Sequence, residues 1–156
     1  MPLLLVCILV LFHIEITSDD EVSILSKKRV YFEDVAYISN YDGDTITVDL
    51  HDKKLPTIFS EHIPVRVRGV DTPELISKDD CEKEVAKRAK IFTQEYLRRA
   101  SRIDLLNVER GKYFRLVADV KLQVGSESVL LAQELLKMRL AIPYDGGTKT
   151  EHDWCL

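Results

Sequence analysis

The sequence lacks several patterns that would each indicate a particular class of protein. Its longest apolar run covers residues 3–12, which is too short for a helix that crosses a bilayer. No C-x-x-C pair occurs among the 3 cysteines, and the 4 histidines form no H-x-x-x-H pair, so a zinc site is not expected. Internal repeats and low-complexity segments are also missing, which argues against a solenoid or a disordered tract.

Positive charge is not in excess either. The chain carries 22 basic and 26 acidic residues, a formal net charge of −4, whereas proteins that coat nucleic acid are usually basic overall. The same balance permits an enzyme whose basic groups gather at one site. With 156 residues, of which 46% are apolar and 31% charged, the composition indicates one globular domain.

The N-terminal segment differs from the rest of the chain. Its apolar run is typical of the central region of a secretory signal peptide, although no Lys or Arg precedes it and no A-x-A site follows. We expect a signal peptide at residues 1–18, a linker at 19–29 and the folded domain at 30–156. This predicts a secreted or periplasmic bacterial protein without stable membrane insertion once the leader is removed. A mis-assigned start codon or a short N-terminal anchor is the alternative.

Removal of the leader would take away Cys7 and leave Cys81 and Cys155. In an oxidising compartment these two can form a disulfide that joins the first helix to the C-terminus. Their spacing alone allows two free thiols equally well.

Hydrophobic periodicity predicts three strands, a helix, two strands and a second helix. Alternation of apolar and polar residues marks the strands, and the 3.6-residue period marks the helices. Asp79 or Asp80 is the expected N-cap of the first helix. The apolar stripes should be Val85, Ala89, Phe92 and Tyr96 on the first helix, and Leu131, Leu135 and Met138 on the second. The expected strands cover residues 30–39, 45–50, 63–70, 102–108 and 115–122; the expected helices cover 80–100 and 128–141.

A helix between the third and fourth of five strands is the arrangement of the OB-fold. We therefore predict an α+β fold, mainly β, built as a five-stranded OB-fold barrel with two to three helices. Periodicity alone leaves another α+β sandwich open.

Two acidic motifs flank the first half of this pattern, and each is weak alone. Asp42-Gly43-Asp44-Thr45 follows the first strand and is typical of a hairpin turn. An EF-hand is excluded because the glycine and the required glutamate are misplaced. The second motif, D-T-P-E at residues 71–74, is typical of a turn around a proline. Arginines on strands, such as Arg66 and Arg115, are usually solvated charges.

Together, the motifs are far more specific. The acidic turn is followed by V-R-V-R-G-V-D-T-P-E at residues 65–74 and by K-Y-F-R-L-V-A-D-V at residues 112–120. In this order they resemble the staphylococcal nuclease (thermonuclease) family, whose nuclease domain has an OB-fold. The resemblance covers roughly residues 30–144.

The resemblance implies a role for each matching residue. Asp44, Asp71 and the carbonyl of Thr72 would bind Ca²⁺, with Asp42 behind the metal. Glu74 would orient or deprotonate the attacking water. The remaining matches are the phosphate-binding pair Arg66 and Arg115, and the nucleotide contacts Lys112, Tyr113 and Tyr144. The neighbouring Phe114, a glycine in the best-known member, is expected in the core rather than on a base.

The chemistry is coherent on physical grounds. Calcium is a hard ion that takes oxygen ligands, a glutamate within hydrogen-bond reach can accept a proton from water, and guanidinium groups fit phosphate oxygens. The resemblance implies calcium-dependent, sequence-tolerant hydrolysis of DNA and RNA, with single strands preferred and 3′-phosphate products. We expect a monomer.

Two other function classes remain. One is a non-catalytic OB-fold module that binds nucleic acid or protein, as in Tudor-staphylococcal nuclease proteins, which have typically lost some of these acids or arginines. Here all of them are present. The other is an acid-rich calcium-binding interaction protein, which would bind calcium equally well with and without a nucleotide.

Overall fold

The computed structural model describes residues 31–149 and 151–155, so the expected leader and linker lie outside the described residues. A sheet orders its main strands β1-β2-β3-β6-β5. Strands β3 and β6 run parallel, and the other neighbours are antiparallel. The strands are β1 (Ala36–Asn40), β2 (Thr45–Asp49), β3 (Ile63–Val67), β6 (Leu116–Val124) and β5 (Arg102–Arg110).

The segment before β1 joins the two edges of this sheet. Phe32 and Leu105 exchange backbone hydrogen bonds of 2.9 and 2.8 Å, and the Val35 N–H donates to the Ile103 carbonyl at 2.9 Å. Because Leu105 and Ile103 belong to β5, the chain before β1 meets the opposite edge of the sheet. The five-stranded OB-fold arrangement expected from the sequence is confirmed.

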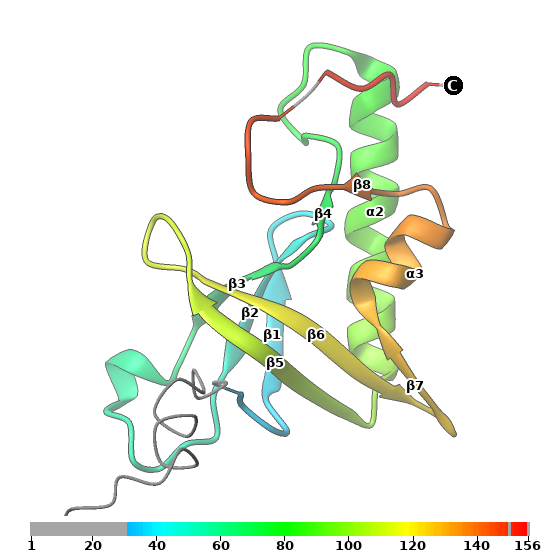
Figure 1. The fold of residues 1–156 in the computed structure, drawn as a ribbon. Coiled ribbons are helices and arrows are strands. Elements are labelled where there is room, and N and C mark those ends of the chain that lie inside the picture. Colours follow the sequence, from blue (N-terminus) through cyan, green and yellow to red (C-terminus); the bar gives the residue numbers. More distant parts are fainter. Residues whose placement is uncertain (1–30, 150, 156) are drawn as a thin grey trace, which may run out of the picture.

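Inward-facing residues of the strands form the core, and two helices cover it. The residues Ile46, Val65 and Leu105 are fully buried. The long helix α2 (Asp80–Arg99) lies along the sheet, and the short helix α3 (Leu131–Lys137) packs beside it (Figure 1). Within the described residues, no helix combines the length and hydropathy that crossing a membrane requires.

The first helix largely agrees with its prediction. Asp79 caps it by accepting hydrogen bonds from the Cys81 and Glu82 N–H groups at 2.8 and 3.5 Å. Of the predicted stripe only Ala89 is fully buried. The buried face is rotated slightly from the predicted stripe and comprises Ala86, Ala89, Thr93 and Leu97. The predicted residues Val85, Phe92 and Tyr96 are partly buried at its margin.

The second helix is predicted too long at both ends. Gly125 has a φ of 60°, and this tight turn sends the chain back along β6 as strand β7 (Glu127–Leu130). The helix starts only at Leu131 and ends before Met138, which is 51% exposed and not on a buried face. A short apolar run does not distinguish a strand from a helix by periodicity alone.

The first and third strands also differ from prediction. Regular pairing in the first begins at Ala36, not at residue 30. The third is broken by Gly69, whose φ of 84° turns the chain. Strand β4 (Val70–Asp71) then pairs with β8 (Ile142–Pro143). A 3₁₀ turn, η1 (Thr57–Phe59), lies in the loop after β2.

Candidate active site

The acidic turn between β1 and β2 is shaped by its first carboxylate. Asp42 Oδ1 accepts hydrogen bonds from the backbone N–H groups of Asp44 at 3.0 Å and Thr45 at 2.7 Å. Side chains of aspartate commonly stabilise turns in this way. Asp42 thus holds the backbone at Asp44 in place.

Gly43 lets this turn pack against neighbouring elements. A Cβ at this position would lie 2.8 Å from both Ala89 Cβ on α2 and Thr72 Cγ2, closer than carbon atoms approach. The buried Thr93 hydroxyl donates to the Gly43 carbonyl at 2.6 Å. The turn is therefore fixed directly on the long helix.

Asp44 is a buried carboxylate with every oxygen bonded. Its Oδ1 accepts from Arg66 Nη1 at 2.5 Å, and its Oδ2 accepts from the Thr72 N–H at 2.9 Å and Oγ1 at 3.1 Å. Burial raises the pKa of Asp44 to about 7, although Arg66 acts in the opposite direction; nearby Asp42 and Asp71 raise it further. The ionised form of Asp44 is therefore costly in this place.

Arg66 joins the two carboxylates that the sequence assigns to the metal. While Nη1 bonds Asp44, Nη2 donates to Asp71 Oδ1 at 2.6 Å and to the Val70 carbonyl at 3.3 Å. Burial works to lower the pKa of Arg66, but Asp44 and Asp71 outweigh it and raise the value. The guanidinium is thus a permanent positive charge between two acids.

These residues suit a calcium ion. Asp44, Asp71 and the Thr72 carbonyl offer the hard oxygen donors that calcium prefers. Asp42 and Asp71 both raise the pKa of Asp44, and Arg66 is the one guanidinium bonded to Asp44 and Asp71 within the part of the chain that is described. A buried group with more negative than positive charge fits a divalent cation.

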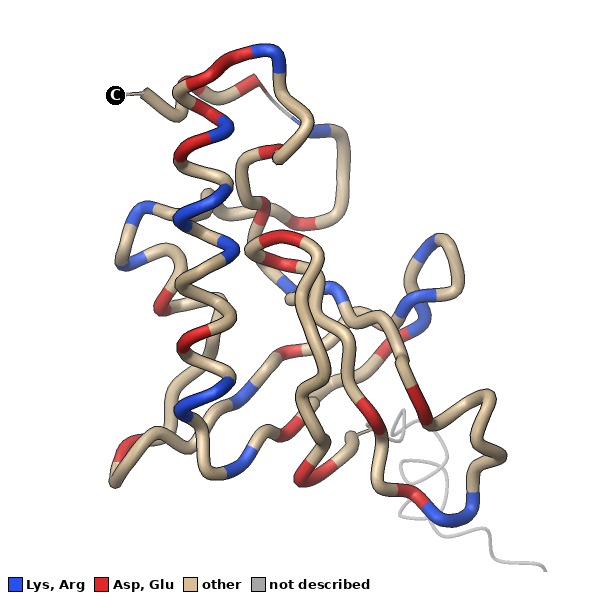
Figure 2. Tube along the Cα trace, turned by 180° about the vertical axis from the view of Figure 1, so that it is seen from behind, with Lys and Arg blue, Asp and Glu red and all other residues tan. Residues whose placement is uncertain are grey.

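A basic cavity of about 580 Å³ opens beside Arg66. Figure 2 shows basic residues (blue) near the tip of the β5–β6 hairpin, and acidic residues (red) between this hairpin and α2. The buried Nε of Arg115 has no hydrogen-bond partner among the described residues. The buried Nε of Arg68 likewise has no hydrogen-bond partner among these residues, although its Nη2 donates to the Asn107 carbonyl at 2.6 Å. The charged residues lining the cavity are Arg66, Arg68, Arg110, Lys112, Arg115 and Asp145.

The expected nucleotide contacts are not all in this cavity. Lys112 and Tyr144 line it, and the Tyr144 ring lies 5.9 Å from the Arg66 guanidinium carbon. Tyr113 is instead 86% exposed at the hairpin tip and does not line the cavity.

The prediction that Phe114 is in the core is wrong, because it is 88% exposed. A hydrogen bond of 2.8 Å from the Gly111 N–H to the Arg115 carbonyl closes the loop. Tyr113 and Phe114 therefore form its tip, each with a φ of 58°.

Glu74 lies apart from the basic cavity, beside a second one of about 360 Å³. Its Oε1 accepts a hydrogen bond from Lys149 Nζ at 2.5 Å, and the same ammonium is 3.0 Å from Asp71 Oδ1. Sequence reasoning missed Lys149, which lies in the polar C-terminal tail. The one signal for it was the cysteine pair, because a bond between the two would bring the tail to α2.

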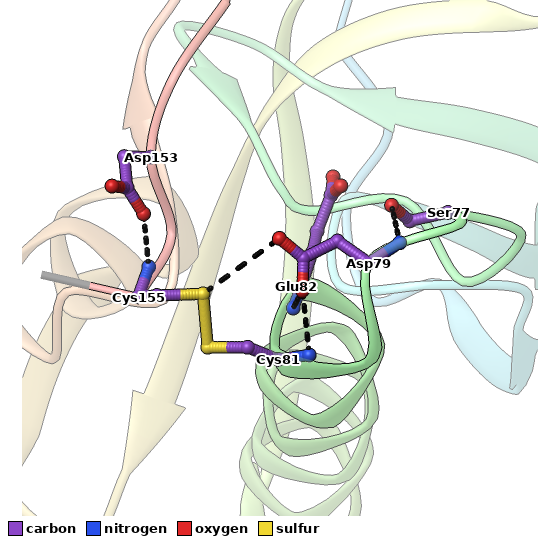
Figure 3. Close-up of a disulfide and its surroundings, with 6 residues drawn as sticks. All are labelled: Ser77, Asp79, Cys81, Glu82, Asp153 and Cys155. Atoms are coloured by element: carbon purple, nitrogen blue, oxygen red, sulfur yellow. Dashed lines mark hydrogen bonds between the residues drawn. A yellow bond between two sulfur atoms is a disulfide. The ribbon is translucent and has the colours of Figure 1, made fainter.

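That bond is present in the structure. Cys81 in the first turn of α2 and Cys155 near the C-terminus form a disulfide with a Cα–Cα distance of 6.0 Å (Figure 3). Asp79, Cys81 and Cys155 are also close enough together to suggest a metal site. The disulfide accounts for this cluster, since oxidised sulfurs are not thiolate ligands.

Comparison with known proteins agrees with this geometry. The model of the family described as staphylococcal nuclease homologue matches residues 64–155. This chain belongs to the staphylococcal nuclease family. No curated protein gives a significant match.

The family match starts within β3 and extends through the tail to the disulfide. It includes Arg66, Asp71, Glu74 and Arg115, and it also includes Lys149. The acidic turn with Asp42 and Asp44 precedes the matched residues, but the fold brings it to Arg66. In this staphylococcal nuclease homologue the sites therefore combine segments that are far apart in the sequence.

Proposed function

We propose that this protein is a calcium-dependent nuclease that hydrolyses DNA and RNA with little sequence preference. The observation that carries the proposal is the position of Arg66. It bonds two carboxylates suited to calcium on one side and lines a cavity rich in cationic side chains on the other. Hydrolysis of a phosphodiester needs a metal or acid site that activates water and cationic groups that neutralise the charge on the phosphoryl oxygens.

The residues divide the chemistry between them. Arg115 and Lys112, which both line the basic cavity, hold the phosphate there. Glu74 lines the second cavity together with the metal-binding residues Asp71 and Thr72, and from there it accepts the proton of the attacking water. Calcium, held by Asp44, Asp71 and the Thr72 carbonyl, supplies a positive charge that polarises the phosphate and favours a nucleophilic water. Arg66 keeps the two acids together and adds a guanidinium near the developing charge.

The cavity favours a single strand as substrate. A volume of about 580 Å³ accommodates a group of about nucleotide size, and among the described residues no helix lines this cavity as a major-groove reader would. Tyr144 in the cavity wall and Tyr113 at the exposed hairpin tip are available for stacking on bases, a sequence-tolerant contact. We further propose 3′-phosphate products, in line with the family resemblance, and a monomeric state. The apolar run at residues 3–12 supports a secreted or periplasmic location.

Digestion of single-stranded DNA tests the proposal. The purified protein should degrade the DNA in millimolar calcium, and a chelator should stop it. Asp44→Ala should abolish cleavage and weaken calcium binding, while Asp52→Ala, in the loop after β2, serves as the matched control. Cleavage that persists in the chelator, or in Asp44→Ala, would refute the metal assignment. A folded wild-type protein without activity would favour a binding module.

A further inference from the structure

We propose that the C-terminal tail completes the active site: Lys149 is a positioning residue for Glu74, and the Cys81–Cys155 disulfide keeps it there. The inference rests on the proposed nuclease function. It assigns a catalytic purpose to a disulfide and a tail that otherwise lie outside the site.

Glu74 has little else to hold it. Its side chain is 59% exposed, and it lies in the connector between β4 and α2, where the Glu74 N–H donates to Glu82 Oε1 at 3.0 Å. Within the described residues, Lys149 is the one hydrogen-bond donor to the Glu74 carboxylate. A general base must be within about 3 Å of the water that it deprotonates, so a carboxylate free to rotate would spend much of its time misplaced.

Lys149 fixes this carboxylate relative to the metal ligands. Its Nζ lies 2.5 Å from Glu74 Oε1 and 3.0 Å from Asp71 Oδ1. Asp71 in turn is bonded to Arg66. The ammonium therefore links the proposed base to the proposed calcium ligand, and it sets the distance between them.

The tail is anchored on both sides of Lys149. Before it, the Tyr144 N–H donates to the Gly69 carbonyl at 3.0 Å, and the Tyr144 hydroxyl donates to the Gly147 carbonyl at 2.7 Å. After it, Cys155 is bonded to Cys81 (Figure 3). A lysine on a free tail would lose conformational entropy each time it formed the pair, and these two anchors reduce that loss.

Zero-length cross-linking tests the placement without reference to activity. A carbodiimide activates a carboxylate, the lysine amine attacks it, and an amide forms as the urea leaves. Peptide mass spectrometry should find Lys149 joined to Glu74 or Asp71 in the oxidised protein, and this product should be lost in Cys81→Ser/Cys155→Ser. The pair Lys87–Glu84 on α2, also 2.5 Å apart, is the internal control and should react in both proteins. Absence of the Lys149 product while the control pair reacts would overturn the inference.

Kinetics test the role. Lys149→Met should lower kcat roughly ten- to hundredfold, as expected of a misplaced catalytic group, without raising the calcium concentration needed for half-maximal rate. Lys149→Arg should retain most of the rate, and Lys87→Met should match wild type. The double serine variant should lose rate as Lys149→Met does, and adding Lys149→Met to it should cost little more.

Three results would count against the idea. An unchanged or increased kcat in Lys149→Met would show that the ammonium is idle or blocks the site. Equal losses in Lys149→Met and Lys149→Arg, together with a lowered melting temperature, would show a structural role only. A wild-type protein without nuclease activity would remove the proposed function and the catalytic part of this inference together, whereas the cross-link would still report the placement.

Discussion

At the scale of the single residue, the buried Asp44 carboxylate lowers the stability of the folded state. It is 1% exposed, and burial raises its pKa to about 7, so an ionised Asp44 adds free energy to the folded state at neutral pH. Four hydrogen bonds surround it, from Arg66, Thr45 and twice from Thr72. A hydrophobic side chain would cost less here, so the buried carboxylate is consistent with the proposed role in binding a cation.

The planar guanidinium of Arg66 is expected to be essential, because it bonds two carboxylates at once. Its two terminal nitrogens bond two different carboxylates at 2.5 and 2.6 Å, a geometry that a lysine with one nitrogen does not reproduce. Arg66→Lys should therefore reduce the rate by about 10²–10³-fold, the usual loss for one donor to the transition state. Initial rates on single-stranded DNA at saturating calcium measure this loss.

Arg68→Lys provides the comparison for that variant. Arg68 lines the same cavity, but it bonds the backbone carbonyls of Asn107 and Val117 and no site carboxylate. We expect its rate to stay within a few-fold of wild type. A rate for Arg66→Lys equal to that of Arg68→Lys would mean that the two-carboxylate bridge is not needed for the reaction.

At the scale of the element, the acidic turn depends on the surface against which it packs. Gly43→Ala would place a Cβ 2.8 Å from Ala89 Cβ, and neither backbone can move far because Thr93 also bonds the turn. Overpacking of this kind costs about 1–3 kcal/mol. We expect a lower free energy of unfolding in urea, together with a rate loss larger than the stability change explains, since Asp44 would shift.

A second substitution that removes one of the clashing groups should relieve this overpacking. Ala89→Gly removes one of the two clashing groups, so Gly43→Ala/Ala89→Gly should recover part of the rate lost in Gly43→Ala. If the double variant is no better than Gly43→Ala, the Ala89 contact does not set the position of the turn.

Closure of the sheet depends on a carboxylate on β5. Asp104 accepts hydrogen bonds from the Asp34 N–H at 3.0 Å and from Arg102 Nε at 2.7 Å. Burial works to raise its pKa, but these two bonds and the Arg102 charge outweigh it, and the pKa is lowered. A lowered carboxyl pKa stabilises the folded state above the unfolded pKa of about 3.9, and this stability is lost as the pH falls through the folded pKa.

Asp104→Asn should consequently be destabilised at pH 6 by about 1 kcal/mol. The difference from wild type should shrink as the pH falls below about 4, because the unfolded wild-type chain then takes up a proton at Asp104, and it should vanish only below the lowered pKa of the folded state. Urea denaturation of both proteins at pH 6, 4 and 3 measures it. A difference that is constant with pH would show that the charge of Asp104 plays no part in closing the sheet.

Most elements could be predicted from sequence because their patterns are local. Alternation at residues 45–50 and the capping aspartate before α2 both follow from the chain itself. Two elements could not be predicted in this way. Strand β7 is paired only because Gly125 returns the chain to β6, and β4 exists only because β8 comes back to it from the C-terminal side.

At the scale of the whole molecule, the candidate site draws on four distant parts of the chain. The acidic turn, the end of β3, the β5–β6 hairpin and the tail meet around Arg66 and Asp71. The motifs predicted the first three, since each carries a recognisable group of residues. Lys149 could not be predicted, because a single lysine in a polar tail belongs to no recognisable motif. Its position depends on a disulfide between two cysteines that are 74 residues apart in the sequence.

The same convergence predicts that calcium and nucleotide bind cooperatively. Arg66 lies between the carboxylates and the basic cavity, so a phosphate in the cavity adds negative charge beside the calcium ligands and a bound cation offsets it. Thymidine 5′-monophosphate should therefore lower the calcium Kd about 5- to 150-fold, the usual range of such coupling, and calcium should tighten the nucleotide by the same factor. Isothermal titration calorimetry in both orders measures the two factors.

Calcium binding that is indifferent to the nucleotide would indicate a calcium-binding interaction protein. Nucleotide binding that is indifferent to calcium would indicate a module that binds nucleic acid without hydrolysing it.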